Sequence, residues 1–377
     1  METTIQNKIW LSSPHMGVME QSFVQDAFDT NWIAPLGPNV TGFEKDIENY
    51  LEKRVHVAAL SSGTAAIHLG LKLLGVANGD EVLCQSFTFS ASANPILYLG
   101  AIPVFIDSEK ETWNMSPELL EKAIKKRSRH GKKPKAIVAV HLYGMPYNIK
   151  EIHQIAKKYE IPILEDSAEA LGSMYNGRKC GTFGDIAVLS FNGNKIITTS
   201  GGGAIVSKNK EYTDKAIFLA TQARDNAPHY QHSEIGYNYR MSNVLAGIGR
   251  GQMLVLNNRV ASRRANFDFY YANLVQLAEN QFLVEPKGYF SNRWLTCILT
   301  PSFEIREKIR LSLLEEDIES RPLWKPMHLQ PIFKDYPNFS DGTSEDLFNR
   351  GLCLPSGSNL MKQDLERVIN IIKKTII

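Results

Sequence analysis

The first complete strand, turn and helix of the chain lie at residues 55–74, which read VHVAALSSGTAAIHLGLKLL. Residues 55–60 are apolar and predict a buried strand, whereas residues 64–74 have the apolar spacing of a helix. Small residues at 61–63 separate the two segments and predict the turn between them. A strand that leads directly into a helix is the unit from which α/β folds with parallel sheets are built.

This unit repeats through the first two-thirds of the chain. The apolar segments that predict further strands lie at 81–84, 103–106, 136–140, 162–164 and 185–191. The amphipathic segments that predict helices lie at 43–53, 117–126 and 149–158. Most of the strands carry Val and Ile without strict alternation, as strands buried on both faces do. We therefore expect an α/β fold in which residues 1–250 form a large domain around a mostly parallel sheet.

The pattern changes after about residue 250. A long helix is predicted at 254–280, strand-like residues follow at 294–300, and further helices are predicted at 305–315 and 361–374. This mixture is typical of a smaller α+β domain, residues 251–377, which the long helix joins to the first domain.

The composition indicates a soluble globular protein. Of 377 residues, 43% are hydrophobic and 22% are charged, and 42 basic against 40 acidic residues give a net charge of +2. A charge so balanced favours neither nucleic acid nor a membrane as a partner. The sequence has no signal-peptide core at its N-terminus and no apolar run of transmembrane length, so we expect a cytoplasmic protein. Its four cysteines lack any spacing suited to zinc, which predicts reduced thiols and no metal site.

The turn after the first strand is a candidate phosphate site. Its small residues let the backbone approach an anion, and the N–H groups at the start of the following helix attract negative charge. The interpretation stays open at this point, because Ser-Gly-Thr at 62–64 is also typical of helix caps that bind no ligand.

Asp166 follows the apolar segment 162–164, at the end of a strand where ligands bind in open α/β sheets. A partly buried carboxylate needs a cationic partner, and the pyridinium nitrogen of pyridoxal phosphate is one. The alternative is an aspartate that caps the next helix.

Lys195 ends the run Ser-Phe-Asn-Gly-Asn-Lys, just after another apolar strand. A lysine at the end of a buried strand can form a Schiff base with a cofactor aldehyde, and the nearby Ser190 hydroxyl can hold the cofactor phosphate. Phe89, which follows the strand at 81–84, can stack on a planar ring. The alternatives are a solvated lysine in a surface loop and a phenylalanine of the core.

With these four segments in order, the chain resembles the DegT/StrS group of sugar aminotransferases over nearly its whole length. Further matches are His-Leu-Tyr-Gly at 141–144 and Gly-Tyr-Asn-Tyr-Arg-Met at 236–241. The resemblance implies the fold-type I architecture of aspartate aminotransferase, with pyridoxal phosphate as the cofactor. It also implies a homodimer with shared active sites, because Asn238 resembles an asparagine that reaches the phosphate from the partner subunit.

The resemblance gives each residue of the cofactor site a role. Lys195 bonds to the cofactor aldehyde and later moves a proton between cofactor and substrate. Asp166 pairs with the pyridine nitrogen, Glu169 lies near the ring hydroxyl, and Phe89 stacks on the ring. The groups that hold the phosphate are the Ser190 hydroxyl and the backbone amides of Gly63, Thr64 and Ala65.

The resemblance also indicates the reaction. Related sugar 3-dehydratases carry histidine in place of Lys195, so a lysine favours amino transfer, with L-glutamate as the donor. The stretch 320–331 resembles that of enzymes that aminate UDP-4-keto-6-deoxy-N-acetylglucosamine at C4. That step leads to a diamino-sugar of the bacillosamine type, used in polysaccharide biosynthesis or protein glycosylation. The candidates for binding the nucleotide sugar are Arg321, Trp324, Lys325 and His328.

Other interpretations stay open. The stretch 320–331 also fits a Pro-rich structural loop. The nearest functional alternative is the same chemistry on a dTDP- or GDP-linked keto-sugar, or at C3. A cofactor-binding regulatory protein without turnover is a second alternative. An ordinary amino-acid aminotransferase is a third, and it needs an arginine clamp for a carboxylate, for which Arg350 and Arg367 are available.

Overall fold

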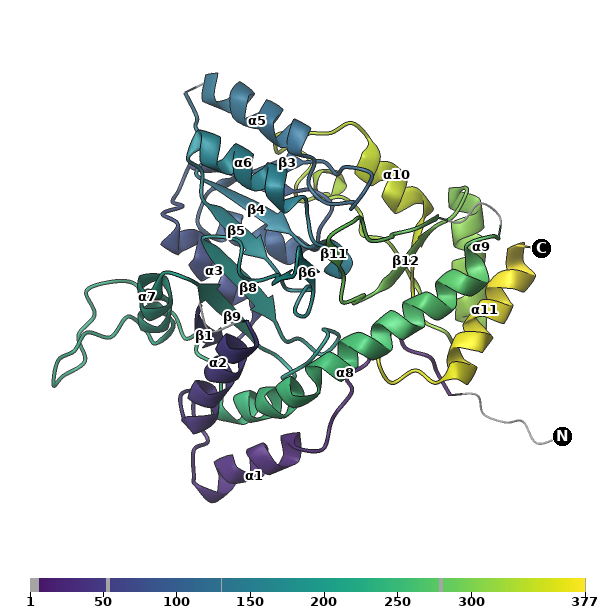
Figure 1. Ribbon diagram of the computed structural model, residues 1–377. Helices are drawn as coiled ribbons and strands as arrows, with labels where there is room; N and C mark the ends of the chain where they lie inside the picture. The colour runs from purple at the N-terminus through teal and green to yellow at the C-terminus, as the bar shows by residue number, and fades with distance from the viewer. Residues whose placement is uncertain (1–6, 52–54, 130, 278–280, 377) are drawn as a thin grey trace.

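The computed structural model describes residues 7–51, 55–129, 131–277 and 281–376. The ends of two predicted helices, residues 52–53 and 278–280, lie outside the described residues. A large and a small domain lie side by side, and one long helix, α8 (Asn243–Leu274), runs from the first to the second (Figure 1).

The large domain is built around one eight-stranded sheet, which confirms the predicted α/β fold. In the order of their pairing, the strands are β1 (His56–Leu60), β9 (Gly203–Ser207), β8 (Ile186–Ser190), β5 (Ile163–Asp166), β4 (Ala136–Val140), β2 (Glu81–Gln85), β3 (Ile102–Ile106) and β14 (Asn338–Phe339). From β8 to β14 every pair is parallel, whereas β9 pairs antiparallel with both β1 and β8. The apolar pattern of the sequence predicts neither β9 nor β14.

Helices cover both faces of this sheet, because successive residues of a strand point to opposite sides. Ile186 and Val188 of β8 face one core, and Ala187 and Leu189 face another. The first face carries α3 (Gly63–Leu73), α4 (Asn94–Tyr98) and α7 (Lys210–Ala220). The second face carries α2 (Pro38–Tyr50), α5 (Pro117–Arg129), α6 (Ile149–Tyr159) and the start of α8.

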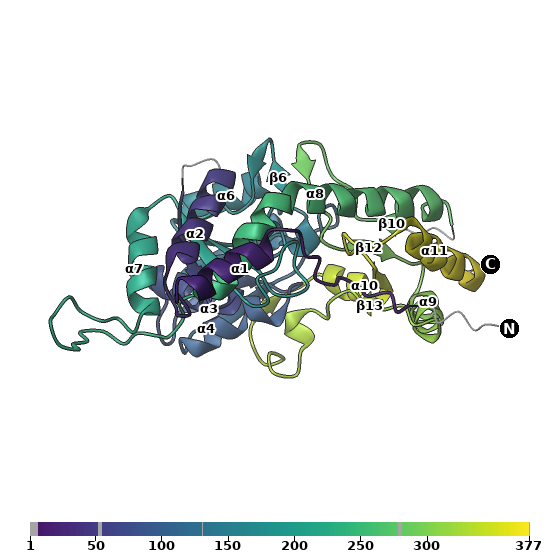
Figure 2. The ribbon, with the colours of Figure 1, turned by 90° about the horizontal axis from the view of Figure 1, so that it is seen from below.

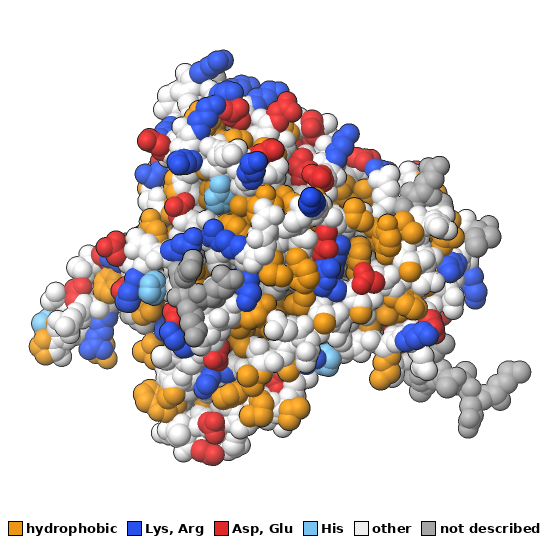
Figure 3. Space-filling model, viewed as in Figure 1, with side chains coloured by type: hydrophobic (Ala, Val, Ile, Leu, Met, Phe, Trp, Pro, Cys, Tyr) orange, Lys and Arg blue, Asp and Glu red, His pale blue; other side chains and the backbone are white. Residues whose placement is uncertain are grey.

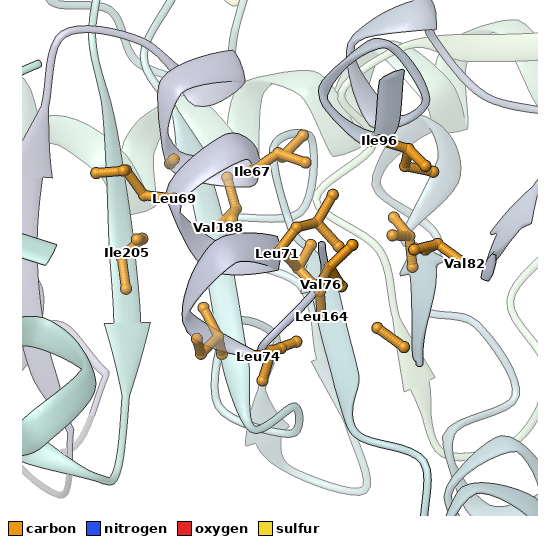
Figure 4. Packing of buried hydrophobic residues seen from close by; sticks show 14 of the residues in the cluster. Ile67, Leu69, Leu71, Leu74, Val76, Val82, Ile96, Leu164, Val188 and Ile205 are labelled. Carbon is orange, nitrogen blue, oxygen red and sulfur yellow. The ribbon is translucent and has the colours of Figure 1, made fainter. Parts of the chain in front are cut away.

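The packing of α3 fixes the position of the turn that precedes it. Figure 4 shows Leu69 and Leu71 of this helix over the sheet, in one buried cluster with Leu164, Val188 and Ile205. Burying an apolar side chain of this size contributes about 2 kcal/mol to folding, so several of them hold the helix firmly in place. The turn at the start of α3 is therefore held at the edge of the sheet where the parallel strands end.

The helix α8 begins at Asn243 rather than at residue 254, where the sequence pattern predicts its start. Glycines at 247, 249 and 251 weaken that pattern, since Gly is a poor helix former. The structure shows why a side chain is excluded at the last of them. A Cβ atom on Gly251 would lie 2.7 Å from the backbone nitrogen of Glu20 in α1 (Glu20–Asp29). Glycine at this position lowers the helix propensity of α8 but allows the helix to pack closely against α1.

The small domain has the predicted α+β character. Its antiparallel sheet contains, in pairing order, β10 (Gln281–Phe282), β12 (Thr296–Leu299), β15 (Gly351–Leu354) and β13 (Arg321–Pro322). Its helices are α9 (Phe303–Glu315), α10 (Thr343–Arg350) and α11 (Lys362–Ile376). A short sheet of β11 (Tyr289–Phe290), β6 (Met174–Tyr175) and β7 (Arg178–Lys179) connects residues of both domains. Figure 2 shows α11 beside the C-terminal half of α8.

Two segments cross the predicted division of the chain at residue 250, which itself falls inside α8. Ile9 pairs with Ile318 and is buried in the core of the small domain. In the other direction, β14 extends the large sheet although it belongs to residues 251–377. The division into 1–250 and 251–377 stays a prediction, and each domain takes a segment from the other part of the chain.

The surface carries both signs of charge. Acidic and basic side chains are interspersed over the face shown in Figure 3, with no large area of one sign. Among the described helices, none combines the length and the apolar character that crossing a bilayer requires.

Candidate active site

A cavity of about 500 Å³ opens where the carboxyl ends of β5 and β8 face the small domain. Of the site residues that the sequence predicts, its lining includes Gly63, Thr64, Phe89, Asp166, Glu169, Ser190, Lys195, Arg321 and Trp324. The predicted site residues that lie outside the lining are Ala65, Asn238, Lys325 and His328. Segments far apart in the sequence therefore meet at the edge where open α/β sheets bind ligands.

The turn before α3 lines this cavity with Ser62, Gly63 and Thr64. The first amides of a helix have no acceptor within the helix, and the Ser62 hydroxyl accepts one of them, from Ala65 at 3.0 Å. The amide of Ala65, predicted to bind phosphate, is thus taken by a helix cap. The amides of Gly63 and Thr64 remain for an anion, and Ser190 lies against this turn, since a Cβ atom on Gly63 would be 3.1 Å from its Oγ. The turn is both a helix cap and a candidate phosphate site.

Asp166 is a buried carboxylate at the floor of the cavity, with 3% of its surface exposed. Its Oδ2 accepts a hydrogen bond from the Ser92 hydroxyl at 2.7 Å, and its Oδ1 accepts one from the Ala168 amide at 3.1 Å. Among the described residues, no lysine, arginine or histidine forms an ion pair with it. A buried charge without a partner is costly, so a cationic group in the cavity would stabilise this site.

Lys195 reaches the cavity from the loop that follows β8. Its Nζ lies 3.3 Å from Oε1 of Glu169 and 4.3 Å from the centroid of the Trp294 ring. The lysine side chain is 11% exposed. The amine is therefore held between one carboxylate and one aromatic face in a largely closed site.

The carboxylate of Glu169 is fixed by a second contact. Its Oε2 accepts the amide of Tyr143 at 2.8 Å, and Tyr143 adopts a left-handed backbone conformation with φ of 53°. Burial raises the pKa of Glu169 to about 7, although Lys195 and the Tyr143 amide act to lower it. Glu169 can thus bind or release a proton near neutral pH, directly beside the lysine.

Glu165, the neighbour of Asp166 on β5, has a structural role. Its carboxylate accepts the backbone amides of Gly181, Phe183 and Gly184. His141 Nε2 lies 2.8 Å from its Oε1. Burial alone would raise the pKa of Glu165, but these hydrogen bonds, that of His141 first, hold it at about 2. His141, Glu165 and Cys180 lie close together, yet the carboxylate oxygens are already occupied, and we assign the cluster to the fold.

The stretch 320–331 is divided between the cavity and the core. Arg321 and Trp324 line the cavity, and their role in binding a substrate stays a prediction. Lys325 is exposed outside it. His328 is buried in η3 (Met327–Leu329), with its Nδ1 2.6 Å from the Ser86 hydroxyl and its Nε2 3.2 Å from Glu345. The structure therefore does not place His328 where a substrate could reach it, because one ring nitrogen holds the loop to Ser86 of the large domain and the other holds it to Glu345 of α10.

The two arginines that an amino-acid aminotransferase could use as a carboxylate clamp lie elsewhere. Arg350 pairs with Asp346 on α10, with its Nε 2.8 Å from Oδ1. Arg367 donates to the backbone carbonyl of Asn7 at 3.2 Å. Neither side chain lines the cavity, so the geometry gives no support to that alternative.

Two residues of the site escape the sequence reasoning. Ser92, which bonds to Asp166, lies in η1 (Ser90–Ser92), in the same segment after β2 as Phe89, and its hydroxyl is a signal that this segment offers. Trp294 is predicted only as the first residue of the strand at 294–300. Its contact with Lys195 depends on how the small domain packs on the large one, and no local pattern of the sequence contains that information.

The comparison with known proteins now decides the family. The profile of the DegT/DnrJ/EryC1/StrS aminotransferase family matches residues 14–373. The chain belongs to this family.

Individual relatives agree with this assignment. The chain is 52% identical to EpsN of Bacillus subtilis strain 168, a candidate pyridoxal phosphate-dependent aminotransferase, over 98% of this chain and 96% of that protein. It is 37% identical to the GDP-perosamine synthase of Escherichia coli O157:H7, over 93% and 94% of the two chains. The crystal structure of the aminotransferase TlmJ from Streptoalloteichus hindustanus is similar with a TM-score of 0.91, at 28% identity over 98% of this chain and 99% of that one.

The family assignment confirms the predicted enzyme class, the predicted cofactor and the predicted fold. The protein is a pyridoxal phosphate-dependent sugar aminotransferase, and its fold is the fold-type I architecture. The site described above fits the cofactor. Asp166, a buried carboxylate that forms no ion pair among the described residues, would pair with the pyridinium nitrogen. Gly63 and Thr64, the first residues of α3, line the cavity where the phosphate would bind, and Lys195 lines the same cavity, where it would hold the aldehyde.

The phosphate turn leads to a prediction about Gly203, the first residue of β9. A Cβ atom at this position would lie 2.4 Å from the backbone nitrogen of Gly63. The Gly203→Ala variant must therefore displace the turn, and we expect its affinity for pyridoxal phosphate to fall about 10-fold or more. Titrating the cofactor-free protein with pyridoxal phosphate measures this. The control is Gly201→Ala, since a Cβ there meets nothing within 4 Å. Equal affinities of the two variants would contradict the close approach.

The raised pKa of Glu169 predicts a dependence of stability on pH. Between the ordinary value of 4.5 and about 7, the folded protein keeps a proton that the unfolded chain has released. Stability must therefore fall as the pH rises through this window, by about 3 kcal/mol at most from this group. The Glu169→Gln variant lacks this loss. We measure urea unfolding of the cofactor-free proteins. The free energy of unfolding of the variant, minus that of the wild type, is expected to increase as the pH rises through this window. A constant difference across the window would show that Glu169 is not buried as an acid.

Proposed function

We propose that this aminotransferase moves the amino group of L-glutamate to C4 of a nucleotide-linked 4-keto-6-deoxy sugar, foremost UDP-4-keto-6-deoxy-N-acetylglucosamine. The observation that carries the proposal is the joint presence of Lys195 and the pair Arg321 and Trp324 in one cavity. A guanidinium suits the diphosphate of a nucleotide sugar, and an indole suits its rings. The stretch 320–331 that supplies them resembles that of enzymes acting on this keto-sugar.

The residues of the cavity supply the steps of such a transfer. Bound here, pyridoxal phosphate supplies an aldehyde and an electron-withdrawing ring. Asp166 keeps a positive charge on the ring nitrogen by pairing with it. Lys195 would hold the aldehyde, and its Nζ, when free, would move a proton between neighbouring atoms. Glu169 stabilises the ammonium of Lys195 while it carries that proton. L-Glutamate leaves as the 2-oxo acid after giving up its amino group, and the keto-sugar then takes the group.

Two sources of support point to other sugars. The Escherichia coli relative is named for GDP-perosamine, which favours a GDP-linked substrate as the second candidate. A relative from Acidithiobacillus ferrooxidans, 32% identical over 85% of this chain, is named as a UDP-N-acetyl-3-dehydro-glucosamine 3-aminotransferase, which supports transfer at C3. A dTDP-linked sugar completes the set. The cofactor-binding regulator without turnover is disfavoured by an intact Lys195 beside Glu169.

Side-by-side turnover separates the candidates that differ in their nucleotide. The enzyme is given L-glutamate and, in turn, the UDP-, GDP- and dTDP-linked 4-keto-6-deoxy sugars at equal concentration. We expect the UDP sugar to give the highest kcat/KM, by about 10-fold or more, because recognising one nucleotide over another requires only one or two specific contacts. A higher kcat/KM for the GDP sugar would replace the proposed substrate with the second candidate.

We further propose a cytoplasmic homodimer. Asn238 is exposed and lies outside the cavity of its own chain, as a residue that serves a partner subunit would. Apolar side chains are exposed before, within and after α1, Val18 at 90%, Phe28 at 59% and Trp32 at 45%, and a second copy of the chain would bury them. The four free and buried cysteines suit a reducing compartment. Light scattering of the purified enzyme tests the dimer, and the mass of a single chain would contradict it.

A further inference from the structure

Trp294 brings the small domain into contact with the reactive amine. Its indole ring lies under Nζ of Lys195, with 4.3 Å between the nitrogen and the ring centroid. A cation within about 6 Å of an aromatic centroid is attracted to the face of the ring, and more strongly where water is excluded. Trp294 itself is 2% exposed. The ammonium of Lys195 therefore rests on a buried aromatic face, with Glu169 beside it.

The indole of Trp294 also fixes the backbone next to Lys195. Trp294 Nε1 donates to the carbonyl oxygen of Asn194 at 2.7 Å. The Ser12 hydroxyl donates to the same oxygen at 2.8 Å. The peptide that leads into Lys195 is thus held from two sides, by the N-terminal segment and by the small domain.

Arg263 of α8 connects these two donors. Its Nη1 donates to the carbonyl oxygen of Trp294 at 2.6 Å, and its Nη2 donates to the Ser12 hydroxyl at 2.9 Å. The side chain is 1% exposed, and in the described part of the chain it pairs with no carboxylate. Burial, and then the neighbouring Arg259, lower the pKa of Arg263 to about 9. The buried guanidinium supports both donors to Asn194, because its own hydrogen bonds hold Trp294 and Ser12 in a fixed relation.

The ring of Trp294 is also prevented from turning away. Tyr143 stacks near it with 6.3 Å between centroids and 18° between planes, and Trp324 lies at 6.2 Å. The backbone carbonyl, the indole N–H and the ring faces of Trp294 each have a partner. Its orientation under Lys195 is therefore set by the surrounding structure and not by the lysine.

We propose that Trp294 is a positioning residue for Lys195. The ring of Trp294 holds the ammonium of Lys195 whenever the amine is free, and its indole N–H fixes the peptide that precedes Lys195. The inference rests on the role proposed for Lys195. In amino transfer the amine leaves the cofactor, carries a proton and returns. An aromatic face attracts the ammonium without accepting its proton. A seat of this kind keeps the amine in one place and leaves its proton available for transfer.

Two substitutions separate the parts of this role. Trp294→Phe keeps an aromatic face and loses the N–H, whereas Trp294→Leu loses both. We expect Trp294→Leu to lower kcat about 30-fold and to change KM less than about 3-fold. The reason is that the substitution misplaces the amine and leaves substrate binding unchanged. We expect Trp294→Phe to recover most of that loss, to within about 5-fold of the wild type. Ser12→Ala removes the second donor to Asn194 and is expected to resemble the Phe variant.

A second measurement needs no sugar and no turnover. Pyridoxal phosphate is added to the cofactor-free proteins, and its covalent attachment to Lys195 is trapped with borohydride at increasing times and located by peptide mass. We expect attachment in Trp294→Leu to be about 10-fold slower than in the wild type, and that in Trp294→Phe to be close to it. If the Leu variant does not fold, as judged by near-ultraviolet circular dichroism, Trp294→Met takes its place.

The chain offers a matched control. Lys8 Nζ lies over the ring of Trp10 at the same distance, 4.3 Å, on the surface of the protein. Trp10→Leu removes that pair and is expected to change neither kcat nor the rate of attachment. Attachment and kcat unchanged in Trp294→Leu would overturn the inference, and so would equal losses in the Phe and Leu variants. Absence of label at Lys195 in the wild type would instead remove the role of the lysine on which the inference rests.

Discussion

Replacing Lys195 with alanine is expected to lower kcat for amino transfer by about 10⁴-fold or more. The amine is the group of the cavity that can both bond to the cofactor aldehyde and move a proton, and it lies between Glu169 and Trp294 for that purpose. Steady-state turnover of L-glutamate and the keto-sugar measures the loss. Borohydride should also trap no pyridoxal phosphate at position 195 in the variant.

Lys195→Arg is the matched control, because it keeps a cation beside Glu169 and cannot bond to an aldehyde in the same way. We expect it to be as inactive as the alanine variant while its thermal unfolding stays closer to that of the wild type. Turnover within 10-fold of the wild type in either variant would show that another group performs the chemistry.

The second large effect concerns Asp166. Asp166→Asn keeps the shape of the side chain but removes the charge that faces the cavity. Its single oxygen can accept a hydrogen bond from the Ser92 hydroxyl or from the Ala168 amide, but not from both. Without that charge the ring nitrogen of the cofactor is no longer held protonated, so we expect kcat to fall about 10³-fold. The same substitution should not lower the free energy of unfolding of the cofactor-free protein by more than about 1 kcal/mol, because it removes an unpaired buried charge. Steady-state kinetics and urea unfolding measure the two effects.

Ser92→Ala provides the comparison for that variant. It removes the hydrogen bond to Asp166 Oδ2 and leaves the carboxylate in place, so a loss of about 10-fold in kcat is expected. The loss of kcat in Asp166→Asn can be expressed as a free energy of activation. A loss of unfolding free energy of the same size would indicate that the residue serves the fold and not the cofactor.

The large domain follows closely from local sequence. Six of the eight strands of the main sheet are predicted, since each is a short apolar segment bounded by turns. β9 is missed because its sequence, Gly-Ala-Ile-Val-Ser, continues a Gly-rich loop without a separate signal. β14 has two residues and exists only through its pairing with β3. Patterns of one segment predict strands, whereas pairing across the chain decides the edge of a sheet.

The candidate site divides in the same way. Lys195, Asp166 and the turn at 61–63 are recognisable because each stands at the end of a buried strand, where parallel strands bring their ends together. Trp294 and His328 are not, because the relation of the two domains decides whether a side chain faces the cavity or the core. The Pro-rich stretch that contains His328 places similar residue types in the cavity and in the core, so residue type alone does not distinguish the two.

The glycines of α8 illustrate a third limit. Their low helix propensity hides the start of the helix at Asn243. The gain that outweighs this propensity is the close packing of α1, which begins far away in the sequence, at Glu20. Propensity is a property of a segment, whereas packing is a property of the folded chain.

The transfer of nitrogen is the most direct test of the central claim. The enzyme is incubated with pyridoxal phosphate, L-glutamate labelled with ¹⁵N, and UDP-4-keto-6-deoxy-N-acetylglucosamine, and the product is examined by NMR. The account predicts ¹⁵N bonded to C4 of the sugar, with none transferred by Lys195→Ala. Absence of ¹⁵N from this sugar and from its GDP- and dTDP-linked counterparts would contradict it.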